Sequence, residues 1–143
     1  MGHVLHVWEG KTPTGRDEAI REFYGLACEH LMDEVSPPTP NIQAFLLDLL
    51  DVWPERPGRR GGIEVDRGSP WKWPASSSAS GPVWRCQAHF PRAAVATYVV
   101  AAIAERHGLN WHDPQPRELQ ARVRPVWEAP GTPLFAEAAL QGK

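Results

Sequence analysis

Residues 91–115 constrain the fold more than any other stretch of this 143-residue chain, because they predict one helix followed at once by one short buried strand. The proline that begins the stretch suits the first turn of a helix, and apolar residues then recur at helical spacing. Gly108 can take the left-handed conformation that often ends a helix. Residues 109–111 then restart the chain as a strand, which an Asp-Pro pair ends. The apolar stripe of this helix consists of Val95, Tyr98, Val99, Ala102 and Ile103.

The rest of the chain adds strands and helices in alternation. Apolar residues at every second position predict a first strand, and Thr39 followed by Pro40 is typical of the start of a helix. The expected elements are a strand at 3–9, helices at 16–35 and 40–53, an optional short strand at 63–65 and a strand at 82–90. This order, β-α-α-(β)-β-α-β, predicts an α/β (α+β) fold. We expect a two-layer sandwich with a small mixed sheet of three to four strands and three main helices.

The chain divides into a single α/β domain at residues 1–115 and an accessory C-terminal extension at 116–143. Within the extension the pattern predicts a helical turn at 116–121, an extended segment at 123–127 and a short helix at 135–140. Residues 55–81 are rich in Pro, Gly, Arg and Ser. The serine run at 76–80 is typical of a flexible loop.

The charge and the apolar content of the chain argue against nucleic acid and membranes as binding partners. The net charge of −2 makes nucleic acid an unlikely partner, and no apolar run reaches the roughly 18 residues needed to span a membrane. The first residues do not form a signal peptide, which favours the cytoplasm. Cys28 and Cys86 are the only cysteines, and we expect both to be buried free thiols.

Short motifs in a fixed order add a resemblance. They are VWEG at 7–10, PTP at 38–40, LL at 49–50 with WP at 53–54, SPW at 69–71, SGP at 80–82, and HGL at 107–109 with DPQ at 113–115. In this order they resemble a family of small, uncharacterised bacterial α/β proteins. The resemblance covers residues 3–115 and implies domain limits, without an activity, a cofactor or a catalytic residue. The chain departs from the pattern in its Arg/Gly-rich insertion at 55–68 and in its extension.

Metal and nucleophile chemistry finds little support in the spacing. His107 and His112 with the adjacent Asp113 could hold zinc or iron, but no motif such as H-E-x-x-H accompanies them. The simpler interpretation is that His107 caps a helix and His112 lies at the surface. Cys86 and His89 are three apart in a strand, so their side chains point to opposite faces. We predict no metal site and no cofactor.

The aromatic loop carries the leading functional hypothesis. Trp71 and Trp73 alternate in a proline-bounded loop that follows Arg59 and Arg60, and Trp and Arg are enriched at binding hot spots. The loop at 59–73 therefore predicts a protein-binding or accessory module, immunity-like or pathway-accessory, whose partner is another protein or a second copy. The alternative is that Trp71 folds back as a lid over the helices.

A pocket at the strand ends is the second hypothesis, and it leaves open whether the protein is an enzyme. If the first and last strands are parallel neighbours, their carboxyl ends meet at one edge of the sheet. Glu9 and Asp113 would then serve as polar or acid/base groups of a small-molecule site, with His112 a further catalytic candidate. Trp8 and Gln115 would bind the ligand there. Equally, Asp113 and Gln115 could only cap a turn.

Overall fold

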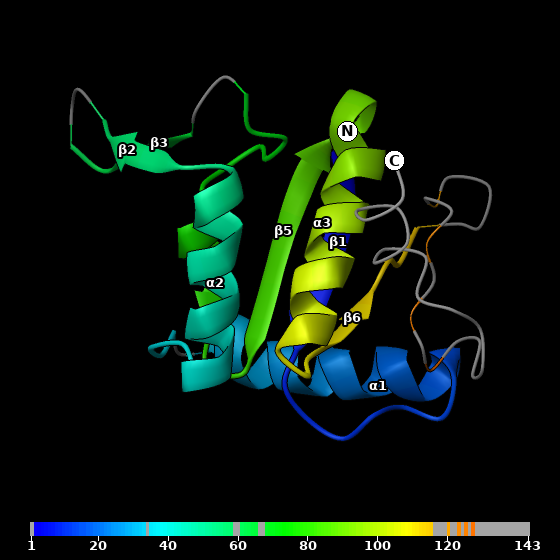
Figure 1. The fold of residues 1–143 in the computed structure, drawn as a ribbon. Helices are drawn as coiled ribbons and strands as arrows, with labels where there is room; N and C mark the ends of the chain where they lie inside the picture. The colour runs from blue at the N-terminus through cyan, green and yellow to red at the C-terminus, as the bar shows by residue number, and fades with distance from the viewer. Residues whose placement is uncertain are drawn as a thin grey trace.

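The computed structural model describes residues 2–33, 35–58, 61–65, 68–115, 120, 123, 125 and 127. A four-stranded sheet in the order β4-β5-β1-β6 forms its centre (Figure 1). These strands are β1 (Gly2–Trp8), β4 (Ala79–Ser80), β5 (Val83–His89) and β6 (Asn110–His112). The three main helices are α1 (Arg16–Ala27), α2 (Pro40–Val52) and α3 (Ala93–Arg106). The α/β class, the small sheet and the three helices are therefore confirmed.

Alternation along β1 divides the core between the two faces of the sheet. Leu5 and Val7 pack against residues of α2 and α3, whereas Trp8 packs against residues of α1. In Figure 1, α2 and α3 stand side by side in front of the sheet and α1 runs across its lower end. The expected two-layer sandwich thus gains a helix on its opposite face.

The helix boundaries follow from local sequence chemistry. The Thr39 hydroxyl accepts a hydrogen bond from the Ile42 backbone N–H at 3.4 Å, and Pro40 occupies the first helical position of α2. Both features confirm the predicted start. In α3 the helix is confirmed but its buried face is rotated from the predicted stripe, since Val95 is exposed. Small residues face the sheet instead and allow close packing, namely Ala93, Ala96, Thr97, Val100, Ala101 and Ala104.

The first helix does not run uniformly to residue 35 as expected. It continues from α1 into a π-helical segment, η1 (Cys28–Asp33). A π-helix has a wider turn than an α-helix. Cys28 is exposed, as is Tyr24 one turn earlier, so the expectation that both thiols are buried is wrong for this one, although both cysteines are free.

The region expected to be irregular contains regular structure. A separate two-stranded ribbon pairs β2 (Glu55–Pro57) with β3 (Ile63–Val65), and only β3 was expected. The serine run forms η2 (Ala75–Ser78), a 3₁₀ helix, and β4, so the flexible-loop prediction is wrong. Ser80 is buried, and its hydroxyl accepts a hydrogen bond from the Ser36 backbone N–H at 2.8 Å.

The pairings of β1 contradict the parallel arrangement expected of the first and last strands. β1 is antiparallel to β5 on one side and antiparallel to β6 on the other, with His6 opposite His112. The physical reason is the crossover through α3, which follows the short η3 (Phe90–Arg92) and carries the chain from β5 to β6 in the same direction. β1 lies between these two strands and runs against both. Within the described residues the sheet is antiparallel throughout, where a mixed sheet was expected.

Part of the C-terminal extension packs on the domain. Val123 is buried in the core under α2 and α3, and Trp127 is buried in the core under α1. The helical turn predicted at 116–121 and the short helix at 135–140 lie outside the described residues, apart from residue 120.

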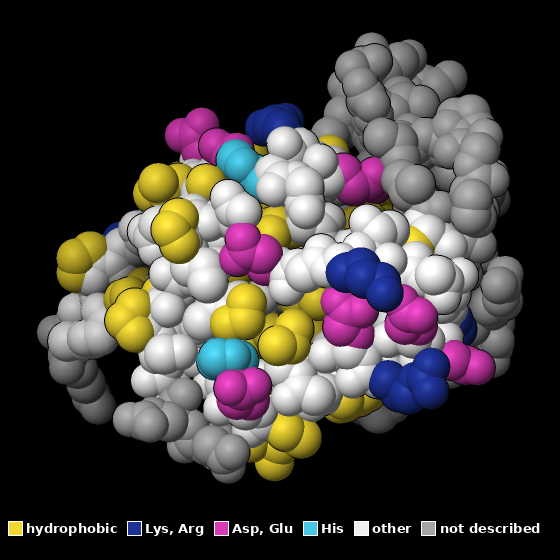
Figure 2. Space-filling view, turned by 90° about the horizontal axis from the view of Figure 1, so that it is seen from below, with side chains coloured by type: hydrophobic (Ala, Val, Ile, Leu, Met, Phe, Trp, Pro, Cys, Tyr) yellow, Lys and Arg dark blue, Asp and Glu magenta, His cyan; other side chains and the backbone are white. Residues whose placement is uncertain are grey.

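The face that α1 crosses is divided in its chemistry (Figure 2). Acidic and basic side chains gather toward the right of the view, where α1 begins, and hydrophobic ones are more frequent toward the left. The first turn of α1 accordingly contains Asp17 and Glu18, which suit the positive end of the helix dipole.

Candidate functional site

The predicted strand-end pocket does not form. Because β1 and β6 are antiparallel, Glu9 follows the end of β1 whereas Asp113 lies across from Leu5. These positions are four residues apart along the strand, about 13 Å. The Glu9 carboxylate instead accepts a hydrogen bond from the Asn41 side chain at 2.6 Å, at the start of α2. The two carboxylates therefore cannot act on one substrate.

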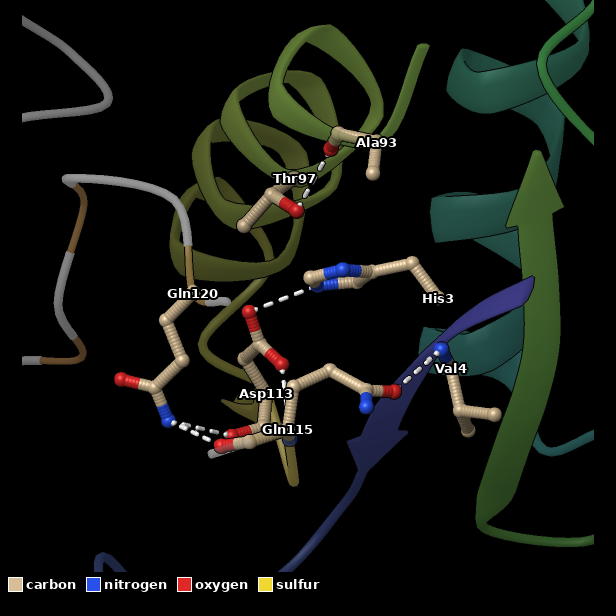
Figure 3. A network of polar contacts seen from close by, with 7 residues as sticks. All are labelled: His3, Val4, Ala93, Thr97, Asp113, Gln115 and Gln120. Atoms are coloured by element: carbon tan, nitrogen blue, oxygen red, sulfur yellow. Dashed lines mark hydrogen bonds and ion pairs between the residues drawn. The ribbon is translucent and has the colours of Figure 1, made fainter. Parts of the chain in front are cut away.

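Asp113 and Gln115 form a buried structural network (Figure 3). One carboxylate oxygen of Asp113 lies 2.8 Å from Nε2 of His3, and the other accepts a hydrogen bond from the Gln115 backbone N–H at 3.0 Å. The Gln115 side chain accepts a hydrogen bond from the Val4 backbone N–H at 3.0 Å. Gln120 donates to the backbone carbonyls of both residues. The turn-capping alternative is confirmed, and the network ties β6 to the edge of β1.

His112 and His6 are buried side by side beneath α1. His112 is 1% exposed, so its predicted surface position is wrong, and neither ring nitrogen has a hydrogen-bond partner. Burial, with a contribution from nearby Arg16, lowers the pKa of His112 to about 4. Burial also lowers the pKa of His6 to about 3, and its ring stacks on Phe23 with centroids 3.8 Å apart. Both imidazoles are neutral at pH 7, and neither is placed to meet a substrate from solvent.

Two of the predicted binding tryptophans belong to the core. Trp71 is 3% exposed and packs edge-to-face against Trp53 and Trp84, so it is the lid that the alternative described. Trp8 is fully buried, and its indole N–H donates to Glu22 at 3.2 Å. Neither ring is available to bind a partner. Arg59 and Arg60 lie outside the described residues.

Trp73 lies on a groove that sequence reasoning did not predict. This half-open groove of about 460 Å³ lies between α1 and η1 on one side and residues 73–78 with β5 on the other. Three large apolar or aromatic side chains on it are exposed to solvent: Met32 by 78%, Tyr24 by 53% and Trp73 by 39%. A cluster of this kind on a protein surface is typical of an interaction site.

The π-helix places the residues of the groove. Phe23 and Ala27 point from α1 into the core, while Cys28 and Met32 reach the groove from η1. Single π-helical turns inside α-helices are frequent at functional sites. A second pocket of about 250 Å³, beside Trp111 and Trp127, is little more than half as large.

A sequence signal for the groove existed in the first helix. Tyr24, Cys28 and Met32 recur at i, i+4 and i+8, in a row beside the core stripe that contains Phe23, Ala27 and Leu31. Two adjacent apolar rows are wider than one helix needs to cover one face of a sheet. The extra row therefore marks a second apolar contact, although its Cys28 was expected to be buried.

The described residues contain neither a metal-binding group nor a membrane-spanning helix. No group of three or more His, Cys, Asp or Glu side chains in this part of the chain is arranged to hold a metal ion. None of the helices described is long and apolar enough to cross a membrane. Comparison of the chain with protein-family models, curated proteins and solved structures gave no match. Membership of the bacterial family that the motifs resemble therefore stays a prediction.

Proposed function

We propose that this protein is a binding module that recognises a protein partner through the groove beside η1. The observation that carries the proposal is the combination of a half-open apolar groove with the exposed side chains of Tyr24, Met32 and Trp73 on it. Aromatic residues and Met are enriched at the centre of protein interfaces. The binding surface differs from the loop at 59–73 first expected, and Trp73 is the residue that the two have in common.

The groove also has the mechanical properties of a recognition site. Its floor is rigid, because Phe23 is fully buried between His6 and Trp8. Its rim is adaptable, because the unbranched side chain of Met32 can rearrange around different shapes. A rigid floor limits the conformational entropy that binding must overcome, and a flexible rim improves the fit.

The chemistry of the cysteines fits a cytoplasmic location for this function. Cys28 lies exposed on the groove and Cys86 is buried, and neither forms a disulfide. Free thiols are typical of reducing compartments. We therefore include the cytoplasm in the proposal.

A selection from a display library of random peptides tests the proposal directly. The purified full chain is the bait, and enriched peptides are then measured by fluorescence anisotropy. We expect Met32→Asp to weaken their binding at least tenfold, since the substitution removes a large apolar contact and adds a carboxylate that must lose water when the peptide covers it. Leu47→Asp is the matched control, because Leu47 is an exposed apolar residue on α2 away from the groove.

The two variants distinguish binding at the groove from non-specific binding to exposed apolar residues. Enriched peptides that bind wild type and Leu47→Asp equally, and fail on Met32→Asp, support the proposal. Equal loss with both variants, or no enrichment on the folded protein, contradicts it. Circular dichroism of both variants establishes that they are folded.

A further inference from the structure

We infer that the partner segment carries a carboxylate among apolar side chains and that Arg85 binds this carboxylate. The inference rests on the proposed function and names the chemistry of the occupant. Arg85 is the only Lys, Arg, Asp or Glu among the described residues that line the groove. A groove with one positive charge in an apolar wall is complementary to an apolar ligand with one negative charge.

Arg85 is held at the groove by the register of β5. Its neighbours on the same face of the strand are Val83 and Gln87, and it lies opposite His6 of β1. The side chain is exposed, and within the described part of the chain it makes no hydrogen bond or ion pair. The neighbouring His6 is neutral and offers no negative charge. The guanidinium is therefore free to bind a ligand.

Two described acidic residues of the bordering segments contact groups other than Arg85. The Glu55 carboxylate accepts hydrogen bonds from the backbone N–H and the hydroxyl of Ser76, next to the groove-lining Ser77 and Ser78. Glu29 on η1 lies 3.9 Å from His30. Neither Glu55 nor Glu29 pairs with Arg85, so a carboxylate of the ligand would supply its counter-charge.

The chemistry of arginine favours a carboxylate over a phosphate. The planar guanidinium can donate two parallel hydrogen bonds to one carboxylate. Phosphorylated segments carry nearly two negative charges and are recognised by clusters of arginines. A single arginine in an apolar groove matches the single charge of Glu or Asp, and the surrounding Tyr24, Met32 and Trp73 match apolar neighbours of that residue.

Exchange of the two charges tests the inference. The peptides selected on the full chain are resynthesised with Glu, Gln or Lys at their acidic position, and each is measured by anisotropy against wild type and Arg85→Glu. We expect Glu→Gln to weaken binding to wild type about tenfold and Arg85→Glu to weaken binding of the Glu peptide still more. We expect the Lys peptide to bind Arg85→Glu better than wild type. Arg21→Glu is the matched control, because Arg21 is an exposed arginine of α1 outside the groove.

The outcomes distinguish a failure of the Arg85 assignment from a failure of the proposed binding function. Rescue of the Lys peptide by Arg85→Glu, with no effect of Arg21→Glu, supports the inference. Peptides that depend on Met32 but show no preference for an acidic residue overturn the inference and leave the proposed function standing. Failure to select any groove-dependent peptide overturns the proposed function itself. Concentration-dependent dimerisation of wild type that Arg85→Glu abolishes would show that a second copy occupies the groove, and would overturn the assignment to a partner protein.

Discussion

Two buried histidines couple the stability of this protein to pH. His6 and His112 have native pKa values of about 3 and about 4, against an ordinary value of 6.5. Between these values and pH 6.5 the unfolded chain binds protons that the folded chain does not. The free energy of unfolding therefore decreases as the pH falls from 6.5. The decrease that is due to His112 is nearly complete at pH 4, where the folded protein also begins to bind this proton.

Replacement of His112 by Leu tests this coupling. The variant removes two buried ring nitrogens that have no partner, so we expect it to be about 1 kcal/mol more stable at pH 7. Between pH 6 and pH 4.5 the slope of stability against pH should also decrease, by about 1.4 kcal/mol per pH unit. Urea unfolding at several pH values measures both effects, and a slope equal to that of wild type would show that His112 does not titrate on unfolding.

Asp113 is expected to be a structural residue. Its carboxylate contacts His3 and the backbone of Gln115 in a buried environment, and removing a buried acceptor leaves its donors without partners. We predict that Asp113→Ala lowers the free energy of unfolding by about 2–3 kcal/mol and leaves groove binding unchanged once the protein is folded. Asp51→Ala, at an exposed position on α2, should change stability by less than about 0.5 kcal/mol. Loss of peptide binding in a folded Asp113→Ala protein would contradict this assignment.

At the scale of helices and strands, the sequence predicts those boundaries that are determined by interactions within one or two turns of the chain. Thr39 and Pro40 predict the start of α2 because a cap and a fixed φ angle act within one turn. The rotation of α3 could not be predicted in this way, because packing favoured small residues such as Ala96 over the larger Val95 against the sheet. The π-helix η1 beside the groove has no reliable local pattern, and its exposed Cys28 was expected to be buried.

The two cysteines differ in their exposure to solvent, and this difference can be measured. Cys28 is exposed at the start of η1, whereas burial raises the pKa of the Cys86 thiol to about 11. We predict that one thiol per native chain reacts with N-ethylmaleimide at pH 7 and that mass spectrometry maps the product to Cys28. The adduct should block the selected peptides, whereas Cys28→Ser should bind them normally and resist labelling. Reaction of both native thiols at similar rates would show that Cys86 is accessible.

Across the whole molecule, the arrangement of strands depends on contacts that no short window of sequence contains. The strands β1, β5 and β6 were predicted at nearly their observed positions, but the antiparallel pairing of β1 with β6 joins residues more than a hundred positions apart. That single difference in direction separated Glu9 from Asp113 and removed the predicted pocket. The long-range topology, rather than the identity of the side chains, decided which candidate site survived.

The same long-range packing makes Trp127 part of the folding unit, although the sequence placed it in an accessory extension. Its indole N–H donates to the Trp111 carbonyl at 3.3 Å, and its ring lies beside His112 in the core that contains Trp8 and Phe23. Truncation of a buried Trp leaves a large cavity, so we predict that Trp127→Ala lowers the free energy of unfolding by about 3–5 kcal/mol.

Val95→Ala is the control for this change, because Val95 is an exposed residue on α3 and its loss should change stability by less than about 0.5 kcal/mol. Urea unfolding followed by circular dichroism measures both variants. A large loss confined to Trp127→Ala would mean that the cooperative unit extends past residue 115, because the cavity would lie in the core under α1. Similar small effects of both variants would mean that the domain folds without residue 127 and that its boundary lies where the sequence predicted it.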